Sequence, residues 1–219
     1  MKKIIILLLF ICFLIITVFK VDASKVTFPL IGKIIVIDPG HGGVDNGASH
    51  LSVKEDNINL AISLFLKEEL ERNGAAVILI REGDYDLSKP NALYRKKNDF
   101  DNRIRIINNS NADLYLSIHL NYFNQSAYYG PQVFYTENIK SNKKIAKILQ
   151  KELNKSLKSK RNIKKTNNSN YMFGKLNVPG VLIECGFLSN YNDRYNLQKK
   201  DYQKKVSLTI TKGIINYYK

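Results

Sequence analysis

Four apolar runs, each about as long as one buried strand, alternate with segments of helical periodicity between Lys33 and the end of the chain. Their sequences are IIVID, AAVILI, LYLSIHL and GVLIECGF. Strands buried on both faces and joined by helices are typical of a sheet with helices packed on either side. The pattern therefore predicts a single α/β domain over residues 33–219, and no linker divides it.

The elements of this domain can be placed from the sequence. Strands are expected at residues 33–38, 75–80, 113–120, 131–137 and 180–187, and helices at 58–70, 100–108, 145–157 and 206–217. The first helix should end at Asn73-Gly74. Within 113–120, leucine and isoleucine alternate with Tyr115, Ser117 and His119. Those three side chains should therefore share the opposite face of the strand.

The first 23 residues differ from the rest of the chain. Lys2 and Lys3 precede an apolar run, residues 4–19, and Val21 and Ala23 fit the small-residue pattern of a signal-peptidase site. The run is shorter than the roughly 20 residues that a membrane span needs. We interpret residues 1–23 as a secretion signal, with an uncleaved membrane anchor as the alternative. In both cases the domain is expected outside the cytoplasmic membrane.

Charge and cysteine content narrow the setting of the domain. The formal net charge of +15 favours an anionic environment: nucleic acid, an acidic membrane surface or an anionic cell wall. Export argues against nucleic acid. After cleavage Cys185 would be the one remaining cysteine, so the core and not a disulfide must hold the fold. The lysine-rich face of residues 143–158 is interpreted as solvated, with a wall-binding patch as the alternative.

Polar residues gather at the carboxyl ends of the expected strands, where α/β sheets form their sites. His41 follows the first strand among glycines, His119 lies at the end of the alternating strand, and Glu184 interrupts an apolar strand. Glu55 lies at the start of the first helix. Two imidazoles and one carboxylate are a common catalytic zinc set that leaves a position for water. A further carboxylate nearby can take and return a proton.

Simpler interpretations stay open for each of these residues. Glu55 could complete a capping box with Ser52. His50 lies in a loop and is the alternative histidine ligand. Cys185 should point away from Glu184 and be buried as a small apolar side chain. Glu184 is harder to explain structurally, because an unpaired carboxylate in an apolar strand is costly and needs a partner or a role.

Four motifs carry a family resemblance: IDPGHGGVDNGAS, KEDNINLAI, DLYLSIHLN and PGVLIECGFLSN. Together they resemble the zinc-dependent N-acetylmuramoyl-L-alanine amidases of the amidase-3 type. The last motif and the short chain are most similar to the spore-cortex type of this family. The resemblance implies a single α/β domain with a mixed, roughly six-stranded sheet and helices on both faces. It assigns His41, Glu55 and His119 as zinc ligands and Glu184 as the catalytic carboxylate.

The same resemblance implies a peptidoglycan substrate. The bond to be cleaved is the amide between N-acetylmuramic acid and L-alanine, and in spore cortex this cleavage leads towards muramic δ-lactam. It also implies a regulatory or activating protein partner, and a supporting role for Phe100, Arg103 and Asn108 near the site. A non-catalytic peptidoglycan-binding protein of the same fold is the alternative. A two-metal phosphoesterase is a further alternative, but it needs more ligands than three histidines supply.

Overall fold

The computed structural model of the chain describes residues 3–6, 27–166 and 171–219. Most of the segment that we interpret as a signal or anchor, residues 1–23, lies outside the described residues. Among the helices that are described, none has the length and apolar character needed to cross a membrane.

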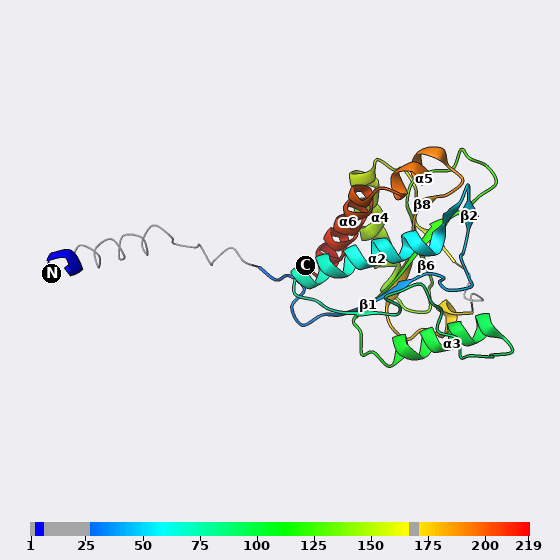
Figure 1. Ribbon diagram of the computed structural model, residues 1–219, viewed down its shortest axis with the longest axis horizontal. Helices are drawn as coiled ribbons and strands as arrows, with labels where there is room; N and C mark the ends of the chain where they lie inside the picture. The colour runs from blue at the N-terminus through cyan, green and yellow to red at the C-terminus, as the bar shows by residue number, and fades with distance from the viewer. Residues whose placement is uncertain (1–2, 7–26, 167–170) are drawn as a thin grey trace.

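A six-stranded sheet runs through the domain in the order β4-β1-β5-β8-β6-β7 (Figure 1). Its strands are β1 (Ile34–Pro39), β4 (Ala76–Leu79), β5 (Leu114–Asn121), β6 (Gln132–Tyr135), β7 (Lys164–Lys165) and β8 (Gly180–Phe187). The strands β4, β1, β5 and β8 are parallel, whereas β6 runs antiparallel to β8. The mixed six-stranded sheet is therefore confirmed.

One face of the sheet is covered by three long helices, which lie above it in Figure 1. They are α2 (Glu55–Arg72), α4 (Asn142–Leu157) and α6 (Lys200–Tyr218). Alternate residues of β1 and β5, such as Ile37 and Leu116, point into this layer and are fully buried. We call this the sealed face.

The other face carries α3 (Arg95–Asn108) and the short 3-10 helix η2 (Phe173–Lys175). A smaller apolar cluster packs there, and it includes Val36, Tyr115 and Phe173. Leu182 and Glu184 of β8 lie farther along this face and are only half-buried. We call this the open face, because its helical cover is incomplete.

The strands and long helices lie where the sequence predicts them. The first helix ends at the expected place, with Asn73 as its C-cap and Gly74 at φ +92°. Helices α3 and α6 begin at Arg95 and Lys200, earlier than expected, since the first turn of each is polar and has no apolar period. Four short features were not expected: the hairpin of β2 (Ser49–His50) and β3 (Val53–Lys54), strand β7, the 3-10 helix η2 and helix α5 (Tyr191–Leu197).

Candidate metal centre

The turn after β1 is held by two buried arginines. His41 has φ +63°, which is unfavourable for a residue with a side chain. Arg103 donates to the His41 carbonyl at 2.8 Å, and Arg81 donates to the carbonyls of Pro39 at 3.0 Å and Gly40 at 2.9 Å. These hydrogen bonds hold the backbone of the turn in one conformation, and the His41 side chain therefore points towards Glu55.

The glycines of this turn make room for the other site residues. A Cβ at Gly40 would lie 2.2 Å from Cε1 of His119, so the imidazole of His119 packs directly on the backbone. A Cβ at Gly47 would lie 2.6 Å from both Glu55 Oε2 and His41 Cδ2. Glycine is therefore required at both positions for the polar side chains to meet.

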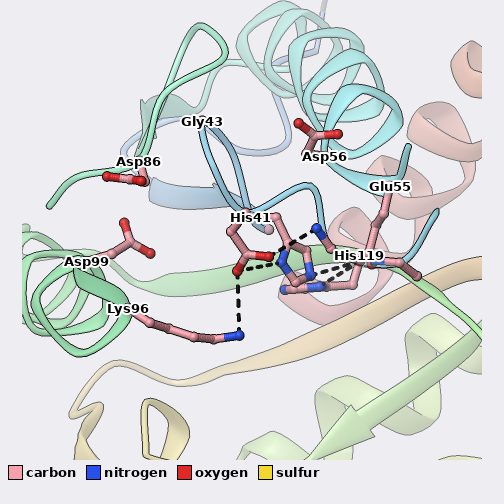
Figure 2. Close-up of polar contacts among 12 residues, drawn as sticks. His41, Gly43, Glu55, Asp56, Asp86, Lys96, Asp99 and His119 are labelled. Carbon is pink, nitrogen blue, oxygen red and sulfur yellow. Dashed lines mark hydrogen bonds and ion pairs between the residues drawn. The ribbon is translucent and has the colours of Figure 1, made fainter. Parts of the chain in front are cut away.

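Three side chains from distant parts of the sequence converge at this edge of the sheet (Figure 2). His41 follows β1, Glu55 begins α2 and His119 lies near the end of β5. Each offers one ligand atom, and the three atoms lie within 4.8 Å of one another. Glu55 Oε1 is 3.3 Å from His41 Nε2 and 3.0 Å from His119 Nδ1. Two imidazole nitrogens and a carboxylate oxygen suit a divalent metal ion such as zinc.

Glu55 is positioned by the surrounding backbone and does not cap its own helix. Its Oε2 accepts from the Ala48 N–H at 2.8 Å, and its Oε1 accepts from the Leu120 N–H at 3.0 Å. The N-cap of α2 is Lys54, and no side chain caps that end of the helix. The capping box with Ser52 is therefore wrong, because the Glu55 carboxylate turns towards the two histidines.

Asp45 orients one of the two imidazoles. Its Oδ2 lies 3.1 Å from His41 Nδ1, which leaves Nε2 of His41 on the side facing Glu55. The Lys96 ammonium lies 3.5 Å from the same Asp45 oxygen and is drawn reaching towards the centre in Figure 2. Metal-binding imidazoles commonly donate their second N–H to a carboxylate in this way. Asp45 was not identified from the sequence.

The charges of the cluster shift its pKa values strongly. Burial alone would lower the pKa of His41, but hydrogen bonds and charge from Glu55 and Asp45 outweigh it and raise that pKa to about 9. Burial alone would raise the pKa of Glu55, but both histidines outweigh it and hold that pKa far below its ordinary value. The carboxylate is therefore ionised throughout the neutral range, as a metal ligand must be.

Glu184 lies beside the cluster on the neighbouring strand. The parallel register of β5 and β8 pairs His119 with Glu184. The Oε2 atom of Glu184 is buried and has no hydrogen-bond partner among the described residues. Burial raises the pKa of Glu184 to about 7; the Glu55 charge adds to this effect, and the two histidines oppose it. A carboxyl group with a pKa near neutrality can both accept and donate a proton.

The remaining candidate residues have structural positions. His50 lies in β2 with its ring centroid 5.8 Å from that of Tyr122, outside the cluster. Cys185 is buried in the core of the sealed face, away from Glu184, as expected. Arg103 supports the His41 turn, whereas Asn108 bonds to the backbone of Lys175 and Asn177 near η2.

Two recesses flank the centre on the open face. The smaller has a volume of about 110 Å³ and lies towards α3, where His41, His119 and Leu182 line it. The larger has a volume of about 390 Å³ and extends over β6 and β7, and Glu184 lines it. Glu184 and the imidazoles therefore stand between two spaces that together can hold an extended substrate.

A partly buried metal-ligand cluster at the carboxyl edge of a mixed α/β sheet, with a neighbouring carboxylate and open recesses, is typical of a metal-dependent hydrolase. Residues 35–216 match the N-acetylmuramoyl-L-alanine amidase family, Amidase_3. The chain therefore belongs to the N-acetylmuramoyl-L-alanine amidase family, and the resemblance seen in its motifs is confirmed.

Individual relatives support this assignment over nearly the whole domain. A germination-specific N-acetylmuramoyl-L-alanine amidase of Bacillus subtilis (strain 168) is 40% identical over 195 residues, which cover 88% of this chain and 82% of the relative. The solved CwlD amidase of Clostridioides difficile, in complex with the GerS lipoprotein, is 41% identical with a TM-score of 0.81. That alignment covers 85% of this chain and 98% of the other.

A more distant structure shares the fold. The catalytic domain of CwlV, an N-acetylmuramoyl-L-alanine amidase from Bacillus (Paenibacillus) polymyxa var. colistinus, is 29% identical with a TM-score of 0.73. The match covers 84% of this chain and 97% of that domain. The sheet and its covering helices are thus a shared architecture of catalytic amidase domains.

Proposed function

We propose that this protein is a zinc-dependent amidase that hydrolyses the bond between N-acetylmuramic acid and the L-alanine of peptidoglycan stem peptides. The observation that carries the proposal is the convergence of His41, Glu55 and His119 beside Glu184. In this proposal residues 33–219 are the catalytic domain, and residues 1–23 are a signal peptide or membrane anchor.

His41, Glu55 and His119 would hold the zinc ion. Zinc bound there supplies a Lewis acid for the scissile carbonyl and lowers the pKa of a water molecule to about 7. The residues fit this role because the ligand atoms lie within 4.8 Å of one another and Asp45 fixes the ring of His41.

Glu184 would move the protons of the reaction. As a general base it takes a proton from the attacking water, and as a general acid it gives a proton to the leaving amine of L-alanine. Its buried, unpaired Oε2 and its pKa of about 7 support this role. Because it lines the larger recess, that recess is the natural place for the leaving peptide.

The biological setting is part of the same proposal. The germination-specific relative and the CwlD relative support action in spore cortex, on the route to muramic δ-lactam. Their class supports a location outside the cytoplasmic membrane, in the wall or cortex space. The CwlD relative was solved with a lipoprotein, which supports a regulatory or activating protein partner for this chain.

Digestion of purified peptidoglycan tests the reaction. The zinc-loaded protein should release free stem peptides and leave N-acetylmuramic acid without them, as measured by mass analysis of the products. Metal content is measured on the same sample, with about one zinc per chain expected. Intact muropeptides after digestion by folded, zinc-loaded protein would favour the alternative of a non-catalytic peptidoglycan-binding protein.

A pair of histidine variants tests the ligand set. His119→Ala should lose both zinc and activity, because one of three ligands is removed. His50→Ala is the matched control, since His50 lies outside the cluster, and it should retain both. Equal zinc in wild type and His119→Ala would contradict the assignment.

A further inference from the structure

A basic groove extends from Glu184 over β6 and β7. We define it by Glu184, Gln132, Arg161, Lys164 and Phe187, which line the larger recess of the open face. The antiparallel register of β6 and β8 pairs Gln132 with Glu184. Since neighbouring strands lie about 4.8 Å apart, the groove begins directly beside the proton-transferring carboxylate.

Gln132 links Glu184 to Arg161. It is buried, and its Nε2 donates to the Asn162 carbonyl at 2.8 Å. The Oε1 atom of Gln132 therefore faces Arg161. It accepts two hydrogen bonds from that guanidinium group, from Nε at 3.2 Å and from Nη2 at 3.0 Å. The guanidinium group is thus oriented by a side chain of the strand next to Glu184.

Two aromatic rings fix the plane of the same guanidinium group. Arg161 Cζ lies 4.8 Å from the centroid of Phe187 and 5.7 Å from that of Tyr128. Its Nη1 makes one long contact, 3.5 Å from the Tyr129 carbonyl. An arginine held in this way loses little conformational freedom when it binds a ligand, and the direction of its free N–H groups is set.

The positive charge of the groove has no protein partner in the part of the chain that the structure describes. Neither Arg161 nor Lys164 forms an ion pair there, and Lys164 lies exposed over the Phe134 ring. The Arg161 charge acts to lower the pKa of Asp193, but the two residues form no ion pair. The Asp193 Oδ2 atom instead accepts hydrogen bonds from the backbone N–H groups of Phe187 and Gly130. A positioned arginine without a carboxylate partner is suited to a carboxylate ligand.

The recess towards α3 differs in charge. Its arginine, Arg103, is fully buried and forms ion pairs with Asp38 and Asp99. Phe100, Phe173 and Leu182 form the apolar part of its lining. An anionic group therefore has a free cation to bind on the β6–β7 side of Glu184, whereas the cation on the α3 side is already neutralised.

We propose that the basic groove binds the first carboxylate of an acidic stem peptide, one residue beyond the alanine at the scissile amide, through Arg161 with Lys164 at its outer end. The inference rests on the proposed amidase function. An extended peptide advances about 3.5 Å per residue. A peptide whose amine lies at Glu184 therefore brings the carboxylate of its second residue towards Arg161. The sugar and its lactyl group then lie on the α3 side.

A pair of substrates that differ in one group tests this assignment. Both are N-acetylmuramoyl dipeptides whose terminal γ-carboxyl group is blocked as a methylamide: one ends in L-alanyl-D-glutamate with a free α-carboxylate, and the other carries the α-carboxamide of isoglutamine in its place. Wild type should prefer the carboxylate form. Arg161→Gln should raise KM for that form by about 10–100-fold, the loss typical of a charge-assisted hydrogen bond, and should change KM for the carboxamide form by less than about threefold.

Three further variants separate charge from geometry. Arg161→Lys keeps the charge but not the planar donors, so it should restore only part of the preference. Lys164→Gln should have a smaller effect than Arg161→Gln, because Lys164 is exposed. Lys165→Gln is the matched control: Lys165 is the next residue of β7 but pairs with Glu137, and its removal should leave both KM values unchanged.

The outcomes separate the groove from the reaction. If wild type cleaves both substrates with equal kcat/KM, or if Arg161→Gln raises KM equally for both, the groove assignment is wrong and the amidase function stands. If zinc-loaded wild type cleaves neither of these substrates nor purified peptidoglycan, the amidase function fails. Calorimetry with the γ-methylamides of L-alanyl-D-glutamate and L-alanyl-D-isoglutamine then still tests the groove, because equal affinity for the two dipeptides would overturn it.

Discussion

The two faces of the central sheet are made from the same strands but differ in burial, in polarity and in the helices that cover them. On the sealed face, residues such as Ile37, Leu116 and Ile183 are fully buried beneath α2, α4 and α6. On the open face, the residues that alternate with them include Glu184 and His119, which are half-buried. Successive side chains of a strand point to opposite faces of the sheet. One strand can therefore place apolar residues in the core and, between them, polar residues at the site.

This difference shows where polar groups can be tolerated. The sealed face gains its stability from apolar area, at roughly 25 cal/mol per Å² removed from water. On the open face, Tyr115 donates to Asp38 at 3.0 Å, and Asp38 pairs with Arg103. Asp38 and Arg103 thus neutralise each other, whereas Glu184 has a buried oxygen with no hydrogen-bond partner among the described residues. The unpaired group belongs to the site, as expected for a residue kept for chemistry rather than stability.

The largest effect is expected from Glu184→Gln on the open face. Glutamine keeps the shape but cannot accept a proton, so kcat should fall by at least 10²–10⁴-fold, the contribution typical of general acid–base catalysis. Zinc content and unfolding temperature should be retained. Glu137→Gln, which removes an exposed carboxylate paired with Lys165, is the control. Loss of zinc together with activity would instead make Glu184 a ligand.

A leucine pair compares the two faces in stability. Leu116→Ala on the sealed face should lower the free energy of unfolding by about 2–5 kcal/mol, because a fully buried side chain leaves a cavity. Leu182→Ala on the open face should cost about half as much or less, since Leu182 is half-buried, but should alter KM because it lines the smaller recess. Equal losses in urea unfolding would show that the open face is packed as tightly as the sealed one.

The raised pKa of Glu184 predicts a pH effect on the metal-free protein. The folded state keeps a proton up to about pH 7, whereas the unfolded chain releases it near the ordinary value of 4.5. Because the native state binds more protons in this window, the contribution of Glu184 to stability falls as the pH rises from 4.5 to 7, by about 3 kcal/mol at most. Glu184→Gln should remove this dependence of the free energy of unfolding on pH between 4.5 and 7. Parallel stability curves for the two proteins, measured by urea unfolding, would contradict the expectation.

The smallest effect is expected from Asp45→Asn, which keeps the open face intact and changes one partner of His41. Without the Asp45 carboxylate next to His41 Nδ1, the affinity for zinc should fall by about 10–100-fold, as is typical for groups that orient a metal ligand. Asp201→Asn is a control on the exposed surface of α6. Competition with a chelator measures both affinities. Unchanged affinity in Asp45→Asn would mean that Arg81 and Arg103 alone fix the turn.

The sealed face could be predicted well from the sequence, and the open face only in part. The spacing of apolar residues along the chain is a local signal of secondary structure. Strand β5 and helix α2 could therefore be placed correctly from it. His41, Glu55 and His119 could be chosen because polar residues at strand ends stand out against apolar runs.

The missed residues act through contacts that no local pattern carries. Asp45 lies in a polar loop and resembles any other turn residue until its distance to His41 is known. Arg161 is held beside Glu184 by a hydrogen bond to Gln132, a residue of β6 that lies 29 positions earlier in the chain. The short elements β2, β3 and β7 have two residues each, too few to show a period. Long-range pairing is therefore the part of the site that a single sequence does not display.

The place of β8 in the sheet has a consequence for how the site is assembled. It is the last strand along the chain, yet it lies between β5 and β6 and carries Glu184. In the sheet, β8 is the strand that joins β6 and β7 to β5. A chain that ends before Gly180 lacks both the strand that makes the sheet continuous and the Glu184 carboxylate. The strand that completes the sheet is therefore also the strand that brings Glu184 beside the two histidines.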